Sequence, residues 1–194
     1  MRADRPVPLN AVMQRMTGLL IGAIFGAVFV IVNAQSPLNG LTVNLLRIAA
    51  GLGAASVIAM WFVTARRGRP AEGARPAEGA RPNMFGKGYL IVVAAEAILL
   101  FGGVRLLSAL GSPEQANVAW VAFVVGVHFI VLAPMWRDRS IAVPGVILSL
   151  LGAAGLVLAS AGAVTWVPLV SGVLSGAVLL AGAVAFGWRT VTAA

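Results

Sequence analysis

Residues 88–110 read GYLIVVAAEAILLFGGVRLLSAL, and residues 118–136 read VAWVAFVVGVHFIVLAPMW. Each run is close in length to the roughly 20 apolar residues that an α-helix needs to cross a bilayer. Neither run has the polar–apolar alternation of a barrel strand. Because backbone groups in hydrocarbon must find their hydrogen bonds inside the protein, we predict that both runs are transmembrane helices.

Four further segments have the same character, and the overall composition agrees with them. Of the 194 residues, 60% are hydrophobic and 10% are charged, and the mean hydropathy is +0.96. Soluble domains are about 45–50% apolar and about 25% charged, so a soluble globular protein is excluded. We predict an all-α polytopic membrane protein, one bundle of six transmembrane helices over residues 12–32, 41–63, 88–110, 118–136, 141–160 and 164–187.

Basic residues divide the connections between these spans into two groups. Twelve of the 14 Lys and Arg residues lie near the N-terminus, in the second and fourth connections, or after the last span, and the other three connections have none. This is the positive-inside pattern, which predicts cytoplasmic N- and C-termini in a multi-pass protein of the inner (plasma) membrane. The net charge of +8 is explained by orientation, so no nucleic-acid partner is expected.

Two features concern linkage and helix packing. Residues 69–80 contain the hexapeptide RPAEGA twice, and its Pro and Gly predict a flexible cytoplasmic loop over 66–87.

In the first span, Gly18, Gly22 and Gly26 form overlapping small-xxx-small steps on one helix face. Such a face lets two helices approach closely. Packing within the chain is the preferred interpretation, and a homo-oligomer through the same glycines is the alternative.

Four ionisable residues lie at membrane depth, namely Arg47, Glu96, Arg105 and His128. Such groups are costly in hydrocarbon and are functional hypotheses by default. Glu96 and His128 each lie eight residues from the same predicted membrane face, about 12 Å deep at about 1.5 Å per residue. Because their spans are consecutive and antiparallel, direct contact between the two side chains is geometrically possible.

Glu96 is the only carboxyl residue within a span. Apolar surroundings favour the neutral acid, so we predict Glu96 as a general acid that His128 tunes or reprotonates. The alternative is structural: a protonated Glu96 that hydrogen-bonds His128, Asn44 or a backbone carbonyl and only joins helices.

Further residues are predicted to bind a substrate around this pair. Two arginines in the outer part of their spans could bind an anionic head group, diphosphate or carboxylate, with snorkelling to lipid phosphate as the alternative. Mid-span aromatic rings could shape an apolar cavity and stabilise a cation over their π faces. The predicted substrate-binding residues are Trp120, Phe123, Phe101, Asn44, Arg47 and Arg105.

No metal or cofactor is predicted. The chain has no Cys and one His, whereas a catalytic zinc site usually has three protein ligands. It also has no glycine-rich nucleotide loop and no Ser–His–acid pattern. The expected partners are membrane lipid and a lipophilic small-molecule substrate.

Two resemblances bear on function. The segment Gly126-Val127-His128-Phe129, followed by Ala133-Pro134-Met135-Trp136 and a basic turn, resembles a segment of small six-span bacterial membrane proteins of unknown function. More loosely, the chain is similar in architecture to small integral-membrane terpene cyclases, which protonate an alkene or epoxide from a buried carboxylic acid. That resemblance implies a cofactor-independent enzyme of terpenoid biosynthesis with Glu96 as the acid.

Three functional hypotheses follow. The preferred one is an integral-membrane enzyme acting on a lipophilic isoprenoid-type substrate, with Glu96 as the proton donor. The second is a small proton-coupled transporter that uses Glu96 as its carrier site. The third is a non-catalytic membrane subunit whose polar residues pack helices together.

Overall fold

The computed structural model describes residues 9–67, 86–136 and 138–192. This part of the chain is all-helical, and six of its helices are long and apolar enough to span a membrane. They are α1 Leu9–Asn33, α2 Gly40–Arg67, α3 Lys87–Ala109, α4 Ala116–Trp136, α5 Ala142–Ser160 and α6 Leu174–Thr192. Shorter elements are the 3-10 helices η1 Arg139–Ile141 and η2 Val164–Trp166 and the π-helix η3 Pro168–Val173. The predicted six-helix membrane protein is confirmed, and the membrane side of its termini stays a prediction.

Most helix ends lie close to the predicted ones, with two clear differences. The predicted span over 164–187 begins as η2 and η3, so that α6 starts only at Leu174 and continues to Thr192. The second difference concerns the connection between α2 and α3. Helix α2 continues through Arg66 and Arg67, which the predicted loop over 66–87 includes. Lys87, the other end of that loop, is the first residue of α3. The rest of the predicted loop, with its hexapeptide repeat, falls on residues 68–85, outside the described residues.

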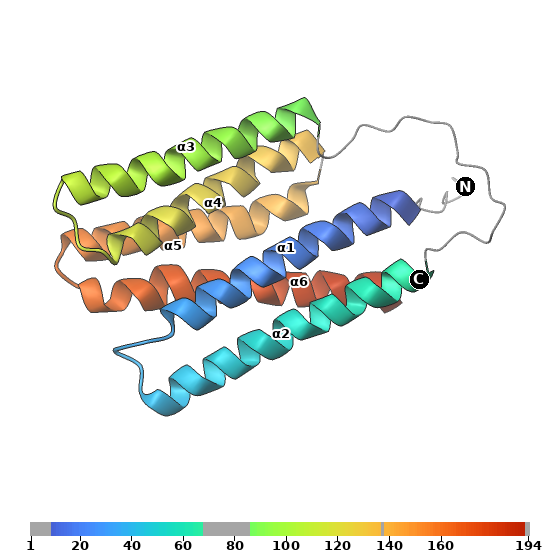
Figure 1. Ribbon diagram of the computed structural model, residues 1–194, viewed down its shortest axis with the longest axis horizontal. Helices are drawn as coiled ribbons and strands as arrows, with labels where there is room; N and C mark the ends of the chain where they lie inside the picture. The colour runs from blue at the N-terminus through green and yellow to red at the C-terminus, as the bar shows by residue number, and fades with distance from the viewer. Residues whose placement is uncertain (1–8, 68–85, 137, 193–194) are drawn as a thin grey trace.

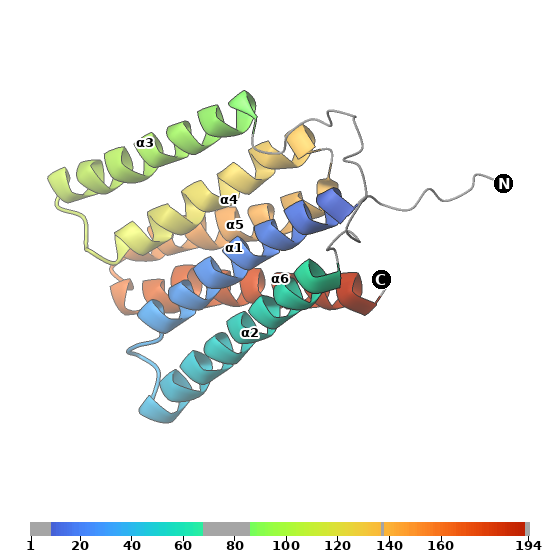
Figure 2. The ribbon, with the colours of Figure 1, turned by 45° about the vertical axis from the view of Figure 1, so that its right-hand side comes forward.

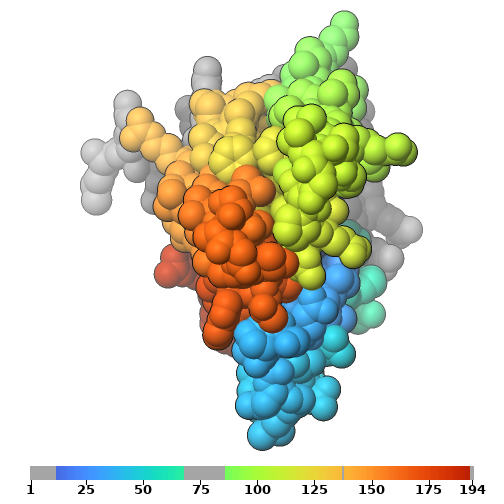
Figure 3. Space-filling model, turned by 90° about the vertical axis from the view of Figure 1, so that its left-hand side faces the viewer, coloured from blue at the N-terminus to red at the C-terminus, as the bar shows by residue number. Residues whose placement is uncertain are grey.

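Consecutive helices run antiparallel, so alternate connections lie at opposite ends of the bundle, and the described basic residues of the helix ends gather at one of them (Figure 1). The face in Figure 3 carries the connections at 34–39, 110–115 and 161–163, none of which contains Lys or Arg. The described basic residues of the helix ends and turns lie at the opposite end, and they are Arg15, Arg66, Arg67, Lys87, Arg139 and Arg189.

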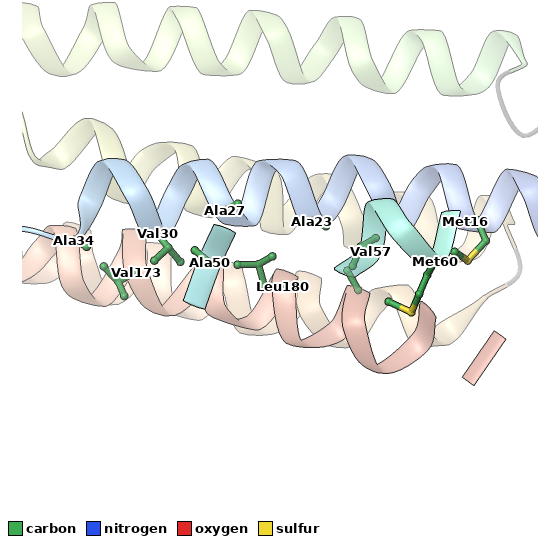
Figure 4. Close-up of a cluster of buried hydrophobic side chains, with 11 residues drawn as sticks. Met16, Ala23, Ala27, Val30, Ala34, Ala50, Val57, Met60, Val173 and Leu180 are labelled. Atoms are coloured by element: carbon green, nitrogen blue, oxygen red, sulfur yellow. The ribbon is translucent and has the colours of Figure 1, made fainter. Parts of the chain in front are cut away.

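The largest buried cluster joins α1, α2, η3 and α6 (Figure 4). Its members are mostly small side chains, and they are Met16, Ala23, Ala27, Val30, Ala34, Ala50, Val57, Met60, Val173, Leu180 and Ala183. A Cβ on Gly26 would lie 2.8 Å from the carbonyl oxygen of Gly176, so α1 and α6 touch through their backbones. A Cβ on Gly18 or Gly22 would meet nothing within 4 Å. Packing within the chain therefore uses Gly26, and the homo-oligomer through Gly18, Gly22 and Gly26 stays a prediction.

Helices α4 and α5 form a second close pair. A Cβ on Gly145 would lie 2.9 Å from the carbonyl oxygen of Gly126. A buried cluster of Val125, Leu148 and Leu179 then connects this pair to α6. These contacts make α4 a fixed support for the helix on its other side.

Helix α3 differs from the other five because none of its residues is buried. It lies at the edge of the bundle beside α4 (Figure 2). Large apolar side chains such as Ile98, which is 72% exposed, lie on the outer surface that would face lipid in a membrane. How this edge helix is held to α4 therefore depends on a small number of contacts.

Candidate functional site

Glu96 and His128 meet at the interface between α3 and α4. Nδ1 of His128 lies 2.9 Å from Oε2 of Glu96, and the two side chains are 12% and 18% exposed. The same Nδ1 atom is buried without a well-directed hydrogen bond, so the two side chains are in close polar contact with poor hydrogen-bond angles. The contact that antiparallel geometry made possible is thus present in the structure.

The chemistry of this pair follows from the one proton that it can share. A carboxylic acid beside a neutral imidazole and a carboxylate beside an imidazolium carry the same net charge of zero. Either state costs less at membrane depth than an isolated charge. The pair can therefore hold one proton at membrane depth without a net charge, and giving that proton to another molecule leaves a charge of −1 on the pair.

The pair is the middle of three contact levels between α3 and α4. At one level, the Trp120 indole fills the place where a side chain on Gly103 would lie, and its Nε1 donates to the Leu99 carbonyl at 2.9 Å. At the opposite level, the ring of Tyr89 stacks on Trp136 with centroids 6.1 Å apart. We name these three levels the α3–α4 stripe.

Along α3, the stripe uses Tyr89, Glu96 and Gly103, which follow one another at intervals of seven residues. This is the heptad spacing that keeps side chains on one side of a packed helix. Gly103 and Tyr89 are absent from the residues predicted from sequence. Their heptad relation to Glu96, in a helix of mainly aliphatic residues, is the signal that points to them.

Two of the predicted aromatic residues lie on or beside the stripe, and one does not. The two on the stripe or beside it are Trp120 and Phe123, whose rings stack with centroids 6.0 Å apart. Phe129, which is not among the predicted residues, meets the neighbouring His128 edge to face at 5.8 Å. Phe101 is 76% exposed on the outer side of α3, so the structure does not bring it to the acid.

The polar residues predicted for substrate binding lie away from the pair. Asn44 and Arg105 are exposed on α2 and α3. Arg47 donates from Nε to the carbonyl of Ile31 and from Nη2 to that of Ala34, both at 3.1 Å. These carbonyls lie at the end of α1, where the last carbonyl groups of a helix have no N–H donor within the helix. Arg47 supplies donors to them and so stabilises the end of α1.

A metal centre has no basis in the described residues, because no three His, Cys, Asp or Glu side chains among them gather into a possible ligand set. Glu96 and His128 alone would leave a zinc ion without its usual third protein ligand.

Comparison with known proteins finds no family model, no curated protein and no solved structure that matches the chain. The fold and the site therefore define a class and no closer relationship: a multi-pass protein with six transmembrane-type helices and a Glu–His pair between two of them. The resemblances to terpene cyclases and to other small six-span proteins stay predictions.

Proposed function

We propose that the protein is an integral-membrane enzyme that protonates a lipophilic, isoprenoid-type substrate with the Glu96–His128 pair. The observation that supports this proposal best is the pair itself, with 2.9 Å between Nδ1 and Oε2 at membrane depth. Ionisable groups at such depth are retained at a cost and usually mark a functional site. Helix joining alone needs only Ser, Asn or a glycine face.

The position of α3 supports substrate entry from the bilayer. Because α3 is an edge helix with no buried residue, the interface that holds the pair lies next to the lipid. Both side chains of the pair keep some exposure, 12% and 18%. A hydrocarbon substrate dissolved in the membrane could therefore reach the acid without crossing water.

The proposed reaction needs no cofactor. With an alkene, the pair transfers one proton to a carbon, and the π electrons form the new C–H bond. With an epoxide, the pair transfers the proton to the oxygen, and the C–O bond breaks with its electrons going to that oxygen. The substrate becomes a carbocation, and the carboxylate left on Glu96 balances its charge. Ring closure uses a second alkene, and loss of a proton from a neighbouring carbon returns it to the pair. The stacked rings of Trp120 and Phe123 lie on α4, the helix that carries His128, and their π faces can stabilise the carbocation.

A solvent-isotope experiment tests the proposal. Membranes with the wild-type protein would be supplied with prenylated substrates that end in an alkene or an epoxide, in ordinary and in deuterated water. From the alkene substrate we expect a cyclised isomer that carries one deuterium at the protonated carbon. From the epoxide substrate we expect a cyclised alcohol, recognised by its new ring because its deuterium lies on an exchangeable hydroxyl. We expect Glu96→Gln to abolish both products. Turnover that survives in Glu96→Gln would rule out the acid role.

A second candidate function, a non-catalytic membrane subunit, is favoured by a specific observation. The pair lies between two other contact levels of the α3–α4 stripe, where a purely structural pair would also lie. Tyr89→Ala is the matched control, because it weakens the stripe two helical turns away and leaves the pair intact. If Tyr89→Ala and Glu96→Gln lower activity and stability in parallel, the pair only joins helices. Substrate-dependent proton movement into proteoliposomes would instead indicate a transporter.

A further inference from the structure

A hollow of about 460 Å³ lies between the end of α4 and the start of α5, at the end of the bundle that carries the basic residues. It is separate from the proposed acid site, because Ile130 on its wall follows His128 by two residues and so points about 200° away around the helix. Its walls are Ile130, Ala133, Pro134, Arg139 and Ala142.

The sequence explains why this place is hollow and apolar. Pro134 lies inside α4 and has no N–H, so the turn that begins at Ile130 lacks one helical hydrogen bond. Ala133 and Ala142 are short side chains on the facing ends of α4 and α5. Four of the five wall residues are therefore aliphatic, and among the described residues only Arg139 brings a charge, its guanidinium, to the wall.

The described neighbours of Arg139 do not neutralise its charge. The acid next to it, Asp138, accepts hydrogen bonds from the hydroxyl of Ser140 at 2.6 Å and from its backbone N–H at 3.0 Å. Asp138 also lies 3.8 Å from Nη2 of Arg15, which balances its charge. The Ser140 hydroxyl lowers the pKa of Asp138, so that carboxylate stays ionised in its own local group. Among the described residues, Arg139 has no acidic partner within ion-pair distance.

The depth of these groups matches an interface. Arg139 follows Trp136, the last residue of α4, by three positions, and Trp at a helix end is typical of the head-group level. Ile130 lies six residues before Trp136 in α4, about 9 Å deeper at about 1.5 Å per residue. A cation at the rim with an apolar wall beneath it complements a molecule that has an anionic head and a hydrocarbon chain.

We propose that this hollow binds an anionic phospholipid of the bilayer, with its head-group phosphate on Arg139 and one acyl chain along Ile130, Ala133 and Pro134. The binding is independent of the reaction at Glu96. Arginine suits the phosphate because its guanidinium offers a planar pair of donors. The short side chain of Ala142 leaves room for the acyl chain to enter the hollow.

Native mass spectrometry of the full-length protein tests this proposal. The protein would be taken from vesicles that hold equal amounts of phosphatidylglycerol and phosphatidylcholine with the same acyl chains. The two site variants are Arg139→Gln and Ala142→Leu, which fills the hollow. Arg189→Gln is the matched control, since Arg189 lies at the same end but faces the ring of Phe186 at 5.9 Å.

We expect the wild-type protein and the control to retain phosphatidylglycerol preferentially. Arg139→Gln should reduce that preference about fivefold, the effect of roughly one basic residue at an anionic surface. Ala142→Leu should reduce retention of both lipids, and Arg139→Lys, which keeps the charge, should retain most of the preference and provides a second test if Arg139→Gln fails to fold. Equal losses in Arg139→Gln and Arg189→Gln would show a diffuse basic rim and overturn the site. Displacement of the lipid by free glycerol phosphate would overturn the choice of a bilayer lipid.

Discussion

Replacing Gly103 by alanine should loosen α3 from α4, although the same change usually stabilises a helix. The indole of Trp120 occupies the place of the new Cβ, so the ring must move or α3 must shift outward. Overpacking of this kind costs about 1–3 kcal/mol, and the lost Trp120–Leu99 hydrogen bond adds about 1 kcal/mol. Alanine in place of glycine returns about 0.5–1 kcal/mol of helix propensity. The net loss in the free energy of unfolding is therefore about 1–3.5 kcal/mol.

Gly102 provides a control on the preceding residue, because a Cβ there would meet nothing within 4 Å. Equilibrium unfolding in mixed micelles, driven by rising dodecyl sulfate, would compare Gly103→Ala and Gly102→Ala with the wild-type protein. We expect Gly102→Ala to be neutral or slightly stabilising, and Trp120→Phe to lose only the hydrogen-bond part. If both glycine variants change stability by the same amount, the close contact at Gly103 does not exist and the α3–α4 stripe is wrongly placed.

Three further predictions concern the rest of the bundle. Gly26→Ala should lower the free energy of unfolding by about 1–3 kcal/mol in the same assay, because its Cβ would lie 2.8 Å from the carbonyl oxygen of Gly176. Gly22→Ala should not lower it, because a Cβ there would meet nothing within 4 Å. Equal effects of the two changes would contradict the α1–α6 contact. Arg47→Gln should cost about 1 kcal/mol through lost bonds to the end of α1, and a variant that unfolds like the wild-type protein would return Arg47 to the list of ligand-binding candidates. The pKa of Asp138 lies below its ordinary value of 3.8, because the Ser140 hydroxyl donates to it, so its stabilising effect should be complete at neutral pH and disappear as the pH falls below about 4. Unfolding of wild-type protein and Asp138→Asn at a series of pH values checks this, and a stability difference that does not shrink in acid would refute it.

The site could be predicted in part. Glu96 and His128 are identifiable because charge is rare in hydrocarbon, and their equal depth follows from counting residues along antiparallel spans. Phe101 shows the limit of such counting. It shares a helix with Glu96 and was expected to share a cavity with it, yet it is 76% exposed on the other side of α3.

The exposed position of α3 could not be foreseen for a physical reason. In a water-soluble helix, the apolar face points inward, so periodicity identifies the buried side. In a membrane, lipid is as apolar as leucine, and helices associate through packing and polar contacts instead. Apart from Glu96 and Arg105, residues 88–110 carry apolar side chains on every side of the helix, so their hydropathy does not show which face meets α4.

The sequence by itself determined six helices, their approximate ends and the concentration of basic residues at one end of the bundle. Those features depend on length, apolarity and charge along the chain, because hydrocarbon requires every backbone group to be bonded within its helix. Only the tertiary structure decided that Gly26 meets Gly176, that Trp120 fills the notch at Gly103, and that Glu96 reaches His128 from an edge helix. Each of these depends on which helix faces meet, and that choice is made by shape and by a few polar groups rather than by hydrophobicity.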